Sequence, residues 1–342
     1  MNNSTAQSHE PLQAIVPDKV RAGIVGGAGY TGGELLRILL RHPGADVAFV
    51  QSKSNAGKPV SAVHRDLVGD TNLQFSDNIL PDADVLFLCA GHGEARKLLA
   101  ELDISETTRI IDLSQDFRLA ENAVSGGRHF VYGLPELQRE TIREAHDIAN
   151  PGCFATAIQL ALLPLASAGL LKTVHVTAIT GATGAGQSLQ PTQHFAWRAN
   201  NISAYKILQH QHLGEISRSL GQLMGRQPDP VHFVPWRGDF TRGIFAGSCT
   251  VCDLSLPELT ALYTEYYQSH PCTHLSAEPI DLKQVVNTNK CLLHLEKSGD
   301  QLVIHSAIDN LLKGASGQAV QNMNLMFGLE ETSGLDFKAS CF

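Results

Sequence analysis

Several features that would assign this chain to a class of protein are missing from its 342 residues. No apolar run predicts a membrane span, and the polar residues 1–19 lack the basic start and apolar core of a secretory signal, so we expect a flexible leader there. Acidic residues outnumber basic ones by 34 to 26 without a basic stripe, which gives no support to nucleic-acid binding. The seven cysteines are odd in number and scattered, which is typical of a reducing compartment. The sequence therefore predicts a cytoplasmic protein with neither a membrane nor a nucleic-acid partner.

A metal site is not predicted either. Cys249 and Cys252 form a CxxC, but the surrounding run has the pattern of a strand, on which residues three apart face opposite sides. There is no second CxxC to complete a zinc site, and the fifteen histidines show no HExxH or similar spacing. We therefore interpret both cysteines as structural.

The arrangement of apolar runs predicts an α/β fold in two parts. Short runs alternate with helical or loop segments at first, which indicates a parallel sheet with covering helices. Longer runs follow residue 153 and indicate a mixed sheet with helices against one face. The expected strands are Val20–Val25, Asp46–Val50, Val85–Cys89 and Arg109–Leu113, then Val174–Thr180, Val231–Val234, Gly243–Cys252, Leu292–Glu296 and Leu302–Ser306.

The first expected strand leads into a glycine-rich loop and then an apolar helix. Gly26, Gly29 and Gly32 have the spacing GxxGxxG, with Tyr30 and Thr31 between the last two. Glycines let the backbone approach a pyrophosphate, and the helix N-terminus offers N–H groups and a favourable dipole. These five residues therefore predict the phosphate-binding part of a Rossmann-type dinucleotide site. We assign residues 20–152 to this domain and expect a helix at 317–330 to complete it.

The end of the second expected strand indicates which dinucleotide is bound. A site that prefers NAD usually places an acidic residue there to hold the ribose hydroxyls. This chain has Gln51-Ser52-Lys53-Ser54 instead, which offers hydroxyl donors and a positive charge to a 2′-phosphate. We therefore predict NADP(H) as the cofactor, bound by Ser52 and Lys53, although a solvated loop would have a similar composition.

A cysteine stands at the start of the most apolar helical run, in Asn150-Pro151-Gly152-Cys153. Pro151 and Gly152 predict a turn, so Cys153 should lie in the first helical turn, where backbone N–H groups point outward. That position favours a thiolate, the nucleophilic form of cysteine. The alternative is a small core residue that packs under a buried helix.

Six segments in order along the chain carry a specific resemblance. They are GGAGYTGGELLR, SKSNAGKPVSAVH, DLSQDFR, YGLPE, NPGCFAT and DNLLKGASGQAVQNMNL. Together they resemble the N-acetyl-gamma-glutamyl-phosphate reductases, a family related to aspartate-semialdehyde dehydrogenase. The resemblance implies NADPH-dependent reduction of an acyl phosphate to an aldehyde through a cysteine thioester, in arginine biosynthesis. It also implies an α+β catalytic and dimerisation domain over residues 153–316 and a homodimer or homotetramer.

The resemblance makes Cys153 the nucleophile and places a base in the segment that follows Tyr205. We predict that His212 is this base, because a helix is expected to begin there and its positive end favours a neutral imidazole. His210 is the second candidate for the base. We expect His210 and Tyr205 to contribute to substrate binding.

Further matched positions receive roles by the same resemblance. Arg118 would hold the phosphoryl group, for which a guanidinium fork is suited, and Asn150 would orient the acyl oxygen. Gly184 lies in a second glycine-rich loop expected to approach the cofactor beside the cysteine. Asn310 would contact the nicotinamide end, whereas Lys313 is equally well interpreted as a solvated lysine.

Two departures from the common family pattern leave the N-acyl group of the substrate open. The family often has HRHxPEI where residues 210–216 read HQHLGEI, and often an arginine where this chain has Gln187. N-acetyl is the expected acyl group and N-succinyl is the alternative, because a longer acidic group requires different donors and charges. An acyl phosphate of aspartate or of carrier-bound aminoadipate also stays open as the substrate, and so does nucleotide sensing without turnover.

Overall fold

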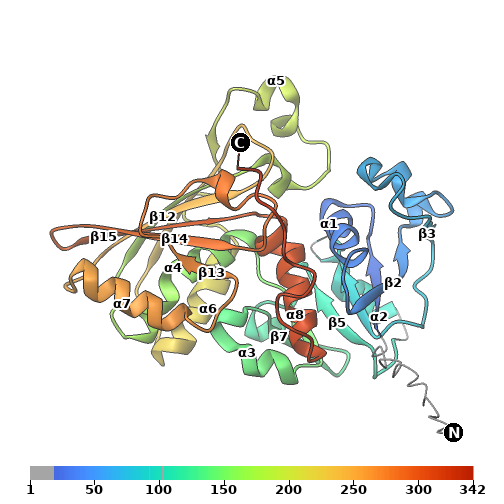
Figure 1. Ribbon diagram of the computed structural model, residues 1–342, viewed down its shortest axis with the longest axis horizontal. Helices are drawn as coiled ribbons and strands as arrows, with labels where there is room; N and C mark the ends of the chain where they lie inside the picture. The colour runs from blue at the N-terminus through green and yellow to red at the C-terminus, as the bar shows by residue number, and fades with distance from the viewer. Residues whose placement is uncertain (1–18, 92, 102–103, 342) are drawn as a thin grey trace, which may run out of the picture.

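The computed structural model describes residues 19–91, 93–101 and 104–341. The predicted leader, residues 1–19, lies outside the described residues except for Lys19. Two sheets form two units that meet along the buried helix Gly317–Met326 (Figure 1). The predicted α/β class is confirmed, with a first sheet that is parallel except for one edge strand and a second sheet that is mixed. None of the helices in the described part of the chain is long and apolar enough to cross a membrane.

The first unit contains an eight-stranded sheet in which seven strands run parallel, with β6 antiparallel at one edge. Its helices are α1 (Tyr30–Leu39), α2 (Glu94–Glu101) and α3 (Pro135–Glu144). In spatial order its strands are β3 (Phe75–Ser76), β2 (Ala45–Gln51), β1 (Val20–Val25), β4 (Val85–Leu88), β5 (Arg109–Asp112), β8 (Asp147–Ala149), β7 (Arg128–Tyr132) and β6 (Val124–Ser125).

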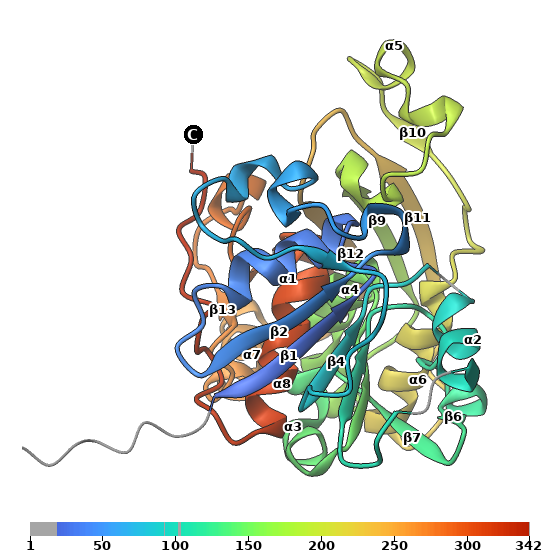
Figure 2. The same cartoon turned by 90° about the vertical axis from the view of Figure 1, so that its right-hand side faces the viewer.

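The second unit contains a seven-stranded mixed sheet. Helices α4 (Cys153–Ser167), α6 (His212–Met224) and α7 (Leu256–Tyr267) lie on one face of it (Figure 1). A long connection from β9 carries the short α5 (Phe195–Arg198) and projects from the molecule (Figure 2). In spatial order the strands are β10 (Ser203–Ala204), β11 (Val231–Arg237), β9 (Val174–Thr180), β12 (Ile244–Val251), β15 (Gln301–Ile308), β14 (Cys291–Ser298) and β13 (Thr273–Leu275).

The last helix, α8 (Gly317–Met326), lies between the two sheets in both views (Figures 1 and 2). It starts where the sequence predicts and ends four residues earlier, and Ala319, Val320 and Met323 pack into the apolar core of the first unit. A π-helical turn at Leu312–Ser316 leads into α8 and reaches the start of α4, where a Cβ on Gly314 would lie 2.9 Å from Cys153 Cβ. The chain thus returns from the second sheet to the first directly beside Cys153.

All nine expected strands form, and their ends differ from the prediction by at most three residues. The structure adds β3, β6, β7, β8, β10 and β13, which the sequence interpretation lacks. β8 and β13 have three residues each and β3, β6 and β10 have two each, so these strands are too short to show an alternation of apolar and polar side chains.

Candidate active site

The glycine-rich loop after β1 is built for close backbone approach. Gly26 has φ +77°, and a Cβ there would lie 2.8 Å from the carbonyl oxygen of Cys89. Gly32 packs so tightly on Gly27 that a Cβ would approach its backbone to 2.6 Å. Gly29, by contrast, has room beside it, because the nearest atom to its Cβ position is 3.7 Å away. The loop therefore presents bare backbone at the start of α1, which is what a pyrophosphate requires.

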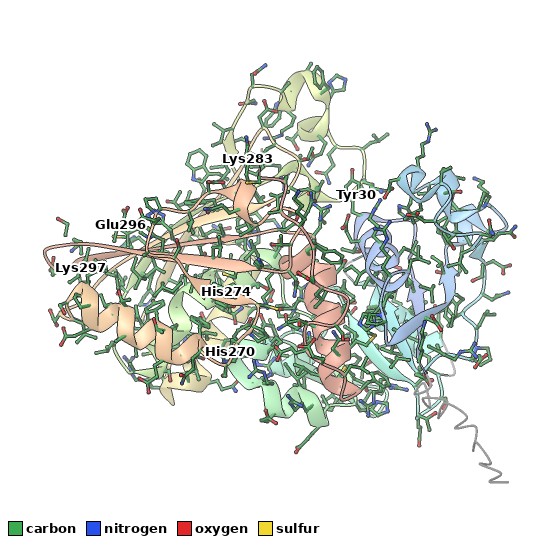
Figure 3. All side chains as sticks on the ribbon, viewed as in Figure 1. Tyr30, His270, His274, Lys283, Glu296 and Lys297 are labelled. Carbon is green, nitrogen blue, oxygen red and sulfur yellow. The ribbon has the colours of Figure 1, made fainter. Side chains whose placement is uncertain are left out.

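Tyr30 and Thr31 form the first turn of α1, where Tyr30 is exposed (Figure 3). No acidic residue lies in that turn. The carbonyl oxygen of Thr31 accepts a 2.9 Å hydrogen bond from Ser316 Oγ, so the π-helical turn fixes the start of the helix. These residues fit the phosphate-binding role that the sequence predicts for them.

The end of β2 carries the residues expected at a 2′-phosphate. Ser52 is buried, and its hydroxyl lies 3.5 Å from that of Ser54. Lys53 begins a short 3-10 turn, and its side chain is exposed. One buried hydroxyl and one exposed cation therefore stand at this strand end, and their contact with a 2′-phosphate stays a prediction.

Cys153 begins α4, as predicted, but the local argument for a thiolate was incomplete. Burial raises the pKa of the Cys153 thiol to about 11 and outweighs the backbone N–H groups of Phe154 and Cys153, which lower it. Arg118 also lowers this pKa and Glu215 raises it. The helix start therefore stabilises the Cys153 thiolate less than burial destabilises it, so the thiol needs a base nearby.

His212 is the first residue of α6, and its ring lies against the residue that precedes the cysteine. A Cβ on Gly152 would fall 2.3 Å from His212 Nε2 and 2.7 Å from Arg118 Nη1. Gly152 itself has an ordinary extended backbone with φ −73°, so glycine is required here by this close approach and not by a special turn. The two predicted groups, His212 and Arg118, thus meet at the N-terminal end of α4.

Glu215 links these groups, and the sequence interpretation assigned it no role. Its carboxylate is 2% exposed and accepts hydrogen bonds from Arg118 Nη1 at 3.1 Å, the Tyr132 hydroxyl at 2.9 Å and the Gly152 backbone N–H at 2.9 Å. Its Oε1 also lies 3.8 Å from His212 Nε2. Glu215 follows His212 by three residues on the same helix, and this spacing is the signal that could have identified it.

His210 packs beside His212, with ring centroids 4.5 Å apart, and its Nδ1 accepts a 3.2 Å hydrogen bond from the His212 backbone. Burial lowers the pKa of His210 to about 3, with a further contribution from the proximity of His212. His210 is therefore neutral at physiological pH. Tyr205 lies 5.8 Å from His210 between ring centroids, so both residues predicted to bind substrate stand in one row with His212.

Arg118 is buried, and hydrogen bonds hold its guanidinium in place. Besides Glu215, it donates to the carbonyl oxygens of Asn150 and Leu113 at 2.8 and 2.9 Å. It also lines a cavity of about 380 Å³ together with Gln211 and Glu215. This placement beside Cys153 is compatible with a contact to the phosphoryl group, which stays a prediction.

Asn150 has a positioning role in the structure. Its amide donates to the carbonyl oxygen of Ala315 at 3.0 Å and accepts from Asn322 at 3.1 Å, and its backbone N–H bonds to Asp112 in β5. These bonds attach the segment before Cys153 to the turn that precedes α8. The predicted contact of Asn150 with the acyl oxygen stays a prediction.

The second glycine-rich loop, residues 181–186, is exposed at Gly184. Asn310 is buried beneath it, donates to Thr183 Oγ1 at 3.0 Å and accepts from the Gly243 backbone at 2.7 Å. Asn310 therefore fixes the shape of the loop, while its contact with the nicotinamide stays a prediction.

The interpretation of Lys313 as a solvated lysine is wrong. Its side chain is fully buried and bonds to Glu136 at 2.8 Å, Gln318 at 2.6 Å and Gln321 at 2.9 Å. The π-helical turn carries Lys313 into the interface between α3 and α8, away from solvent. No local pattern around Lys313 indicates this, because Glu136 lies 177 positions earlier in the chain.

Across residues 19–91, 93–101 and 104–341 no group of three or more His, Cys, Asp or Glu side chains is placed to hold a metal ion. The carboxylate oxygens of Glu296 lie 3.6 Å from His294 Nε2 and 3.5 Å from His305 Nε2. This group of three side chains belongs to the second sheet and is far from Tyr30, which marks the first glycine-rich loop (Figure 3).

Comparison with protein families matches both units. A model described as the NAD binding domain of semialdehyde dehydrogenases matches residues 21–145, and one described as the semialdehyde dehydrogenase dimerisation domain matches residues 153–310. Among solved structures, aspartate semialdehyde dehydrogenase II of Vibrio cholerae has a TM-score of 0.70 at 17% identity, covering 91% of this chain and 99% of that chain. At 17% identity, the similarity to this solved structure concerns the fold alone.

Closer relatives share nearly the whole length of the chain. A protein of Christiangramia forsetii named N-acetyl-gamma-glutamyl-phosphate reductase is 56% identical over 94% of this chain and 100% of its own length. Proteins of the same name from Flavobacterium johnsoniae and Bacteroides thetaiotaomicron are 55% and 54% identical with the same coverage.

Proposed function

The chain belongs to the N-acetyl-gamma-glutamyl-phosphate reductase family, and on that premise we propose that it reduces N-acetyl-gamma-glutamyl phosphate to N-acetylglutamate semialdehyde, releasing phosphate. The observation that carries this proposal is the meeting of Cys153, His212 and Arg118 at one end of α4. A nucleophile, a base and a cation are the groups that acyl transfer from a phosphate requires.

In the first step Cys153 Sγ attacks the acyl carbon, a thioester forms, and the bond from that carbon to the phosphate oxygen breaks. His212 takes the thiol proton, which is needed because burial raises the pKa of Cys153 to about 11. Glu215, 3.8 Å from His212 Nε2, stabilises the positive imidazolium that results. Arg118 faces the negative charge of the departing phosphate.

In the second step the thioester carbon is reduced and the carbon–sulfur bond breaks to release the aldehyde. The two glycine-rich loops would hold a reduced nicotinamide dinucleotide, which would supply the hydride for this step. Asn310 holds the second loop and Ser316 holds the start of α1, so the two loops keep a fixed relation to Cys153. The proton on His212 returns to the sulfur as the thiolate leaves.

NADPH is the proposed cofactor. The fit rests on the bare backbone at Gly29 and on the buried Ser52 and exposed Lys53 at the end of β2, where the segment 51–54 carries no acidic side chain. A hydroxyl and a cation favour a 2′-phosphate over a free ribose hydroxyl.

We also propose a homodimer formed by the uncovered face of the second sheet. Along β12 every second residue is only partly buried, including Phe245 and Cys249, while the alternate residues are buried and include Ile244 and Ala246 of the apolar core. Rings of His175 and His232 stack on each other on the neighbouring strands. Light scattering should give twice the mass of one chain, and a monomer that does not associate at micromolar concentration would contradict the proposal.

The activity is tested in the direction of phosphorylation, with N-acetylglutamate semialdehyde, phosphate and NADP⁺. We expect the wild-type protein to form NADPH and Cys153→Ser to form none, while both bind NADPH equally. His212→Asn should lower kcat by about a hundredfold or more with a smaller effect on KM. A serine variant with near-normal turnover would contradict the covalent route.

The acyl group is decided by a substrate panel. N-acetyl-, N-succinyl- and unsubstituted glutamate semialdehyde should be compared with aspartate semialdehyde by kcat/KM. We expect the N-acetyl compound to lead; a lead of the N-succinyl compound would keep the chemistry and change the substrate.

A further inference from the structure

Arg237 ends strand β11 at the rim of the site and has no role in the proposed reaction. Its backbone pairs with Thr180 on β9, the residue just before the second glycine-rich loop, and with Ser203 on β10. Its side chain is partly exposed, while its Nε is buried and donates no hydrogen bond within the described part of the chain. The guanidinium is therefore held near the cofactor loop with donor capacity to spare.

The guanidinium lies directly beside the row of rings that leads to Cys153. Its Cζ is 4.6 Å from the centroid of the Tyr205 ring, which lies 5.8 Å from His210. Burial raises the pKa of Tyr205 to about 12, the proximity of Cys153 adds to this rise, and the charge and hydrogen bonding of Arg237 oppose it. Tyr205 therefore lies near both the nucleophile and Arg237.

Positive charge predominates around Arg237. Arg198 donates to the backbone carbonyl of Arg237 at 2.9 Å, and its pKa is lowered by burial and by the charge of Arg237. Lys206 adds a third cation, which acts on His210. The carboxylate of Asp239 offsets part of this charge at Arg198, but it also accepts a hydrogen bond from the Asn200 backbone.

No ion pair in the described part of the chain neutralises Arg237 itself, whereas Arg242 nearby in the sequence pairs with both Glu34 and Asp309. Arg198 and Arg237 lie together, Asp239 offsets charge at Arg198, and both Arg237 and Lys206 act on His210. This excess of positive charge favours an anionic ligand. The ligand that reaches this rim must therefore carry negative charge at the end remote from the reacting carbon.

We propose that Arg237 binds a carboxylate of the acyl-phosphate substrate, a proposal that rests on the proposed function. The phosphoryl group must lie at Cys153, where Arg118 stands, so an anion held by Arg237 beside the Tyr205 ring belongs to the other end of the same molecule. A glutamyl substrate carries its α-carboxylate there, and an N-succinyl group would carry a second carboxylate. The planar guanidinium fork, fixed over the Tyr205 ring, matches carboxylate geometry. Arg237 is thus a residue that determines specificity.

The test compares full-length wild-type protein with Arg237→Gln, Arg237→Lys and Arg226→Gln. Arg226 is an exposed arginine that pairs with Asp229 and serves as the control. We expect Arg237→Gln to raise KM for the semialdehyde by about thirtyfold with kcat changed less than about threefold, because a desolvated charge pair is lost. KM for NADP⁺ should stay unchanged, Arg237→Lys should be intermediate, and Arg226→Gln should match the wild type.

The choice of substrate shows which of the two carboxylates Arg237 binds. If Arg237→Gln raises KM equally for N-acetyl- and N-succinylglutamate semialdehyde, Arg237 binds the α-carboxylate. If KM rises more for the N-succinyl compound, Arg237 binds the carboxylate of the succinyl group. Both results support the proposal. An unchanged KM for both compounds overturns it, and so does a loss confined to kcat or to KM for NADP⁺. If the wild-type protein turns over neither compound, the proposed function fails instead.

A measurement on the wild-type protein covers the case in which Arg237→Gln does not fold. Phenylglyoxal modifies arginine, and peptide mapping reports the rate at each position. N-acetylglutamate, which carries the α-carboxylate, should slow modification of Arg237 and leave Arg226 unaffected. If neither N-acetylglutamate nor N-succinylglutamate protects Arg237, the proposal is wrong.

Discussion

The carboxylate of Glu34 accepts hydrogen bonds from both terminal nitrogens of Arg242, at 2.9 and 3.2 Å, although the two residues are 208 positions apart. The same guanidinium donates to Asp309 at 3.0 and 3.2 Å. Glu34 lies in α1, whose start follows the first glycine-rich loop, and Asp309 precedes Asn310, which holds the second loop. Arg242 therefore joins the two segments that carry the glycine-rich loops of the proposed cofactor site.

Arg242→Gln should loosen this connection. Removing Arg242 leaves the fully buried Asp309 without a charge partner and leaves Arg37 as the remaining charge partner of Glu34, so we expect a loss of about 3 kcal/mol in the free energy of unfolding. NADPH should bind about tenfold more weakly. Urea denaturation and a fluorescence titration measure the two effects. As a control, Lys97→Gln breaks an exposed ion pair with Glu94 and should change neither the free energy of unfolding nor the affinity for NADPH. If Arg242→Gln has normal stability and normal affinity, Arg242 does not hold the two segments together.

Gly152→Ala should damage catalysis without unfolding the protein. The new Cβ would fall 2.3 Å from His212 Nε2 and 2.7 Å from Arg118 Nη1, so both side chains must move from their positions beside Cys153. We expect kcat to fall by about a hundredfold, as displacements near 1 Å do in other active sites. Normal kcat in Gly152→Ala would mean that His212 is not held at this position for catalysis.

The reactivity of Cys153 should depend steeply on pH. Because burial raises the pKa of its thiol to about 11, the thiolate fraction is small at neutral pH and grows about tenfold per pH unit up to that value. Iodoacetamide labelling of the protein alone, followed by mass spectrometry, should accelerate accordingly between pH 7 and pH 9. A labelling rate that levels off below pH 8 would show that the helix start and Arg118 outweigh burial.

Protonation of His210 should destabilise the fold in acid. Burial lowers its pKa to about 3 from the ordinary 6.5, so below pH 6.5 the unfolded chain binds a proton that the folded protein rejects. The free energy of unfolding should then fall with decreasing pH between 6.5 and 3, by up to about 1.4 kcal/mol per pH unit from this residue. His210→Gln should remove this part of the slope. If the free energy of unfolding falls equally steeply with pH in the variant and the wild type, the pKa of His210 is not lowered by burial.

Lys53→Asp should change the preference for the cofactor. The substitution replaces an exposed cation at the end of β2 with a charge that repels a 2′-phosphate and can accept from ribose hydroxyls. We expect KM for NADPH to rise about tenfold while KM for NADH falls. Lys58→Asp, at another exposed lysine of the same region, is the matched control. Equal use of both cofactors by the wild-type protein would refute the choice of NADPH.

The elements that the sequence determined by itself are those that depend on near neighbours. The glycine spacing from Gly26 to Gly32, the apolar run after Cys153 and the helix start at His212 each specify a local backbone shape, and the structure has each element where the sequence predicts it. Helices and long strands are readable in this way because their side-chain periods recur within a few residues.

Tertiary structure alone decided the charge state and the partners of the buried groups. Arg118 meets Glu215 across 97 positions, and Lys313 meets Glu136 across 177, so no local pattern reveals either pair. The same holds for Cys153, whose helix start favours a thiolate while burial by distant segments raises its pKa. Electrostatic energies depend on distance in space and on exclusion of water, and both are set only when the chain has folded.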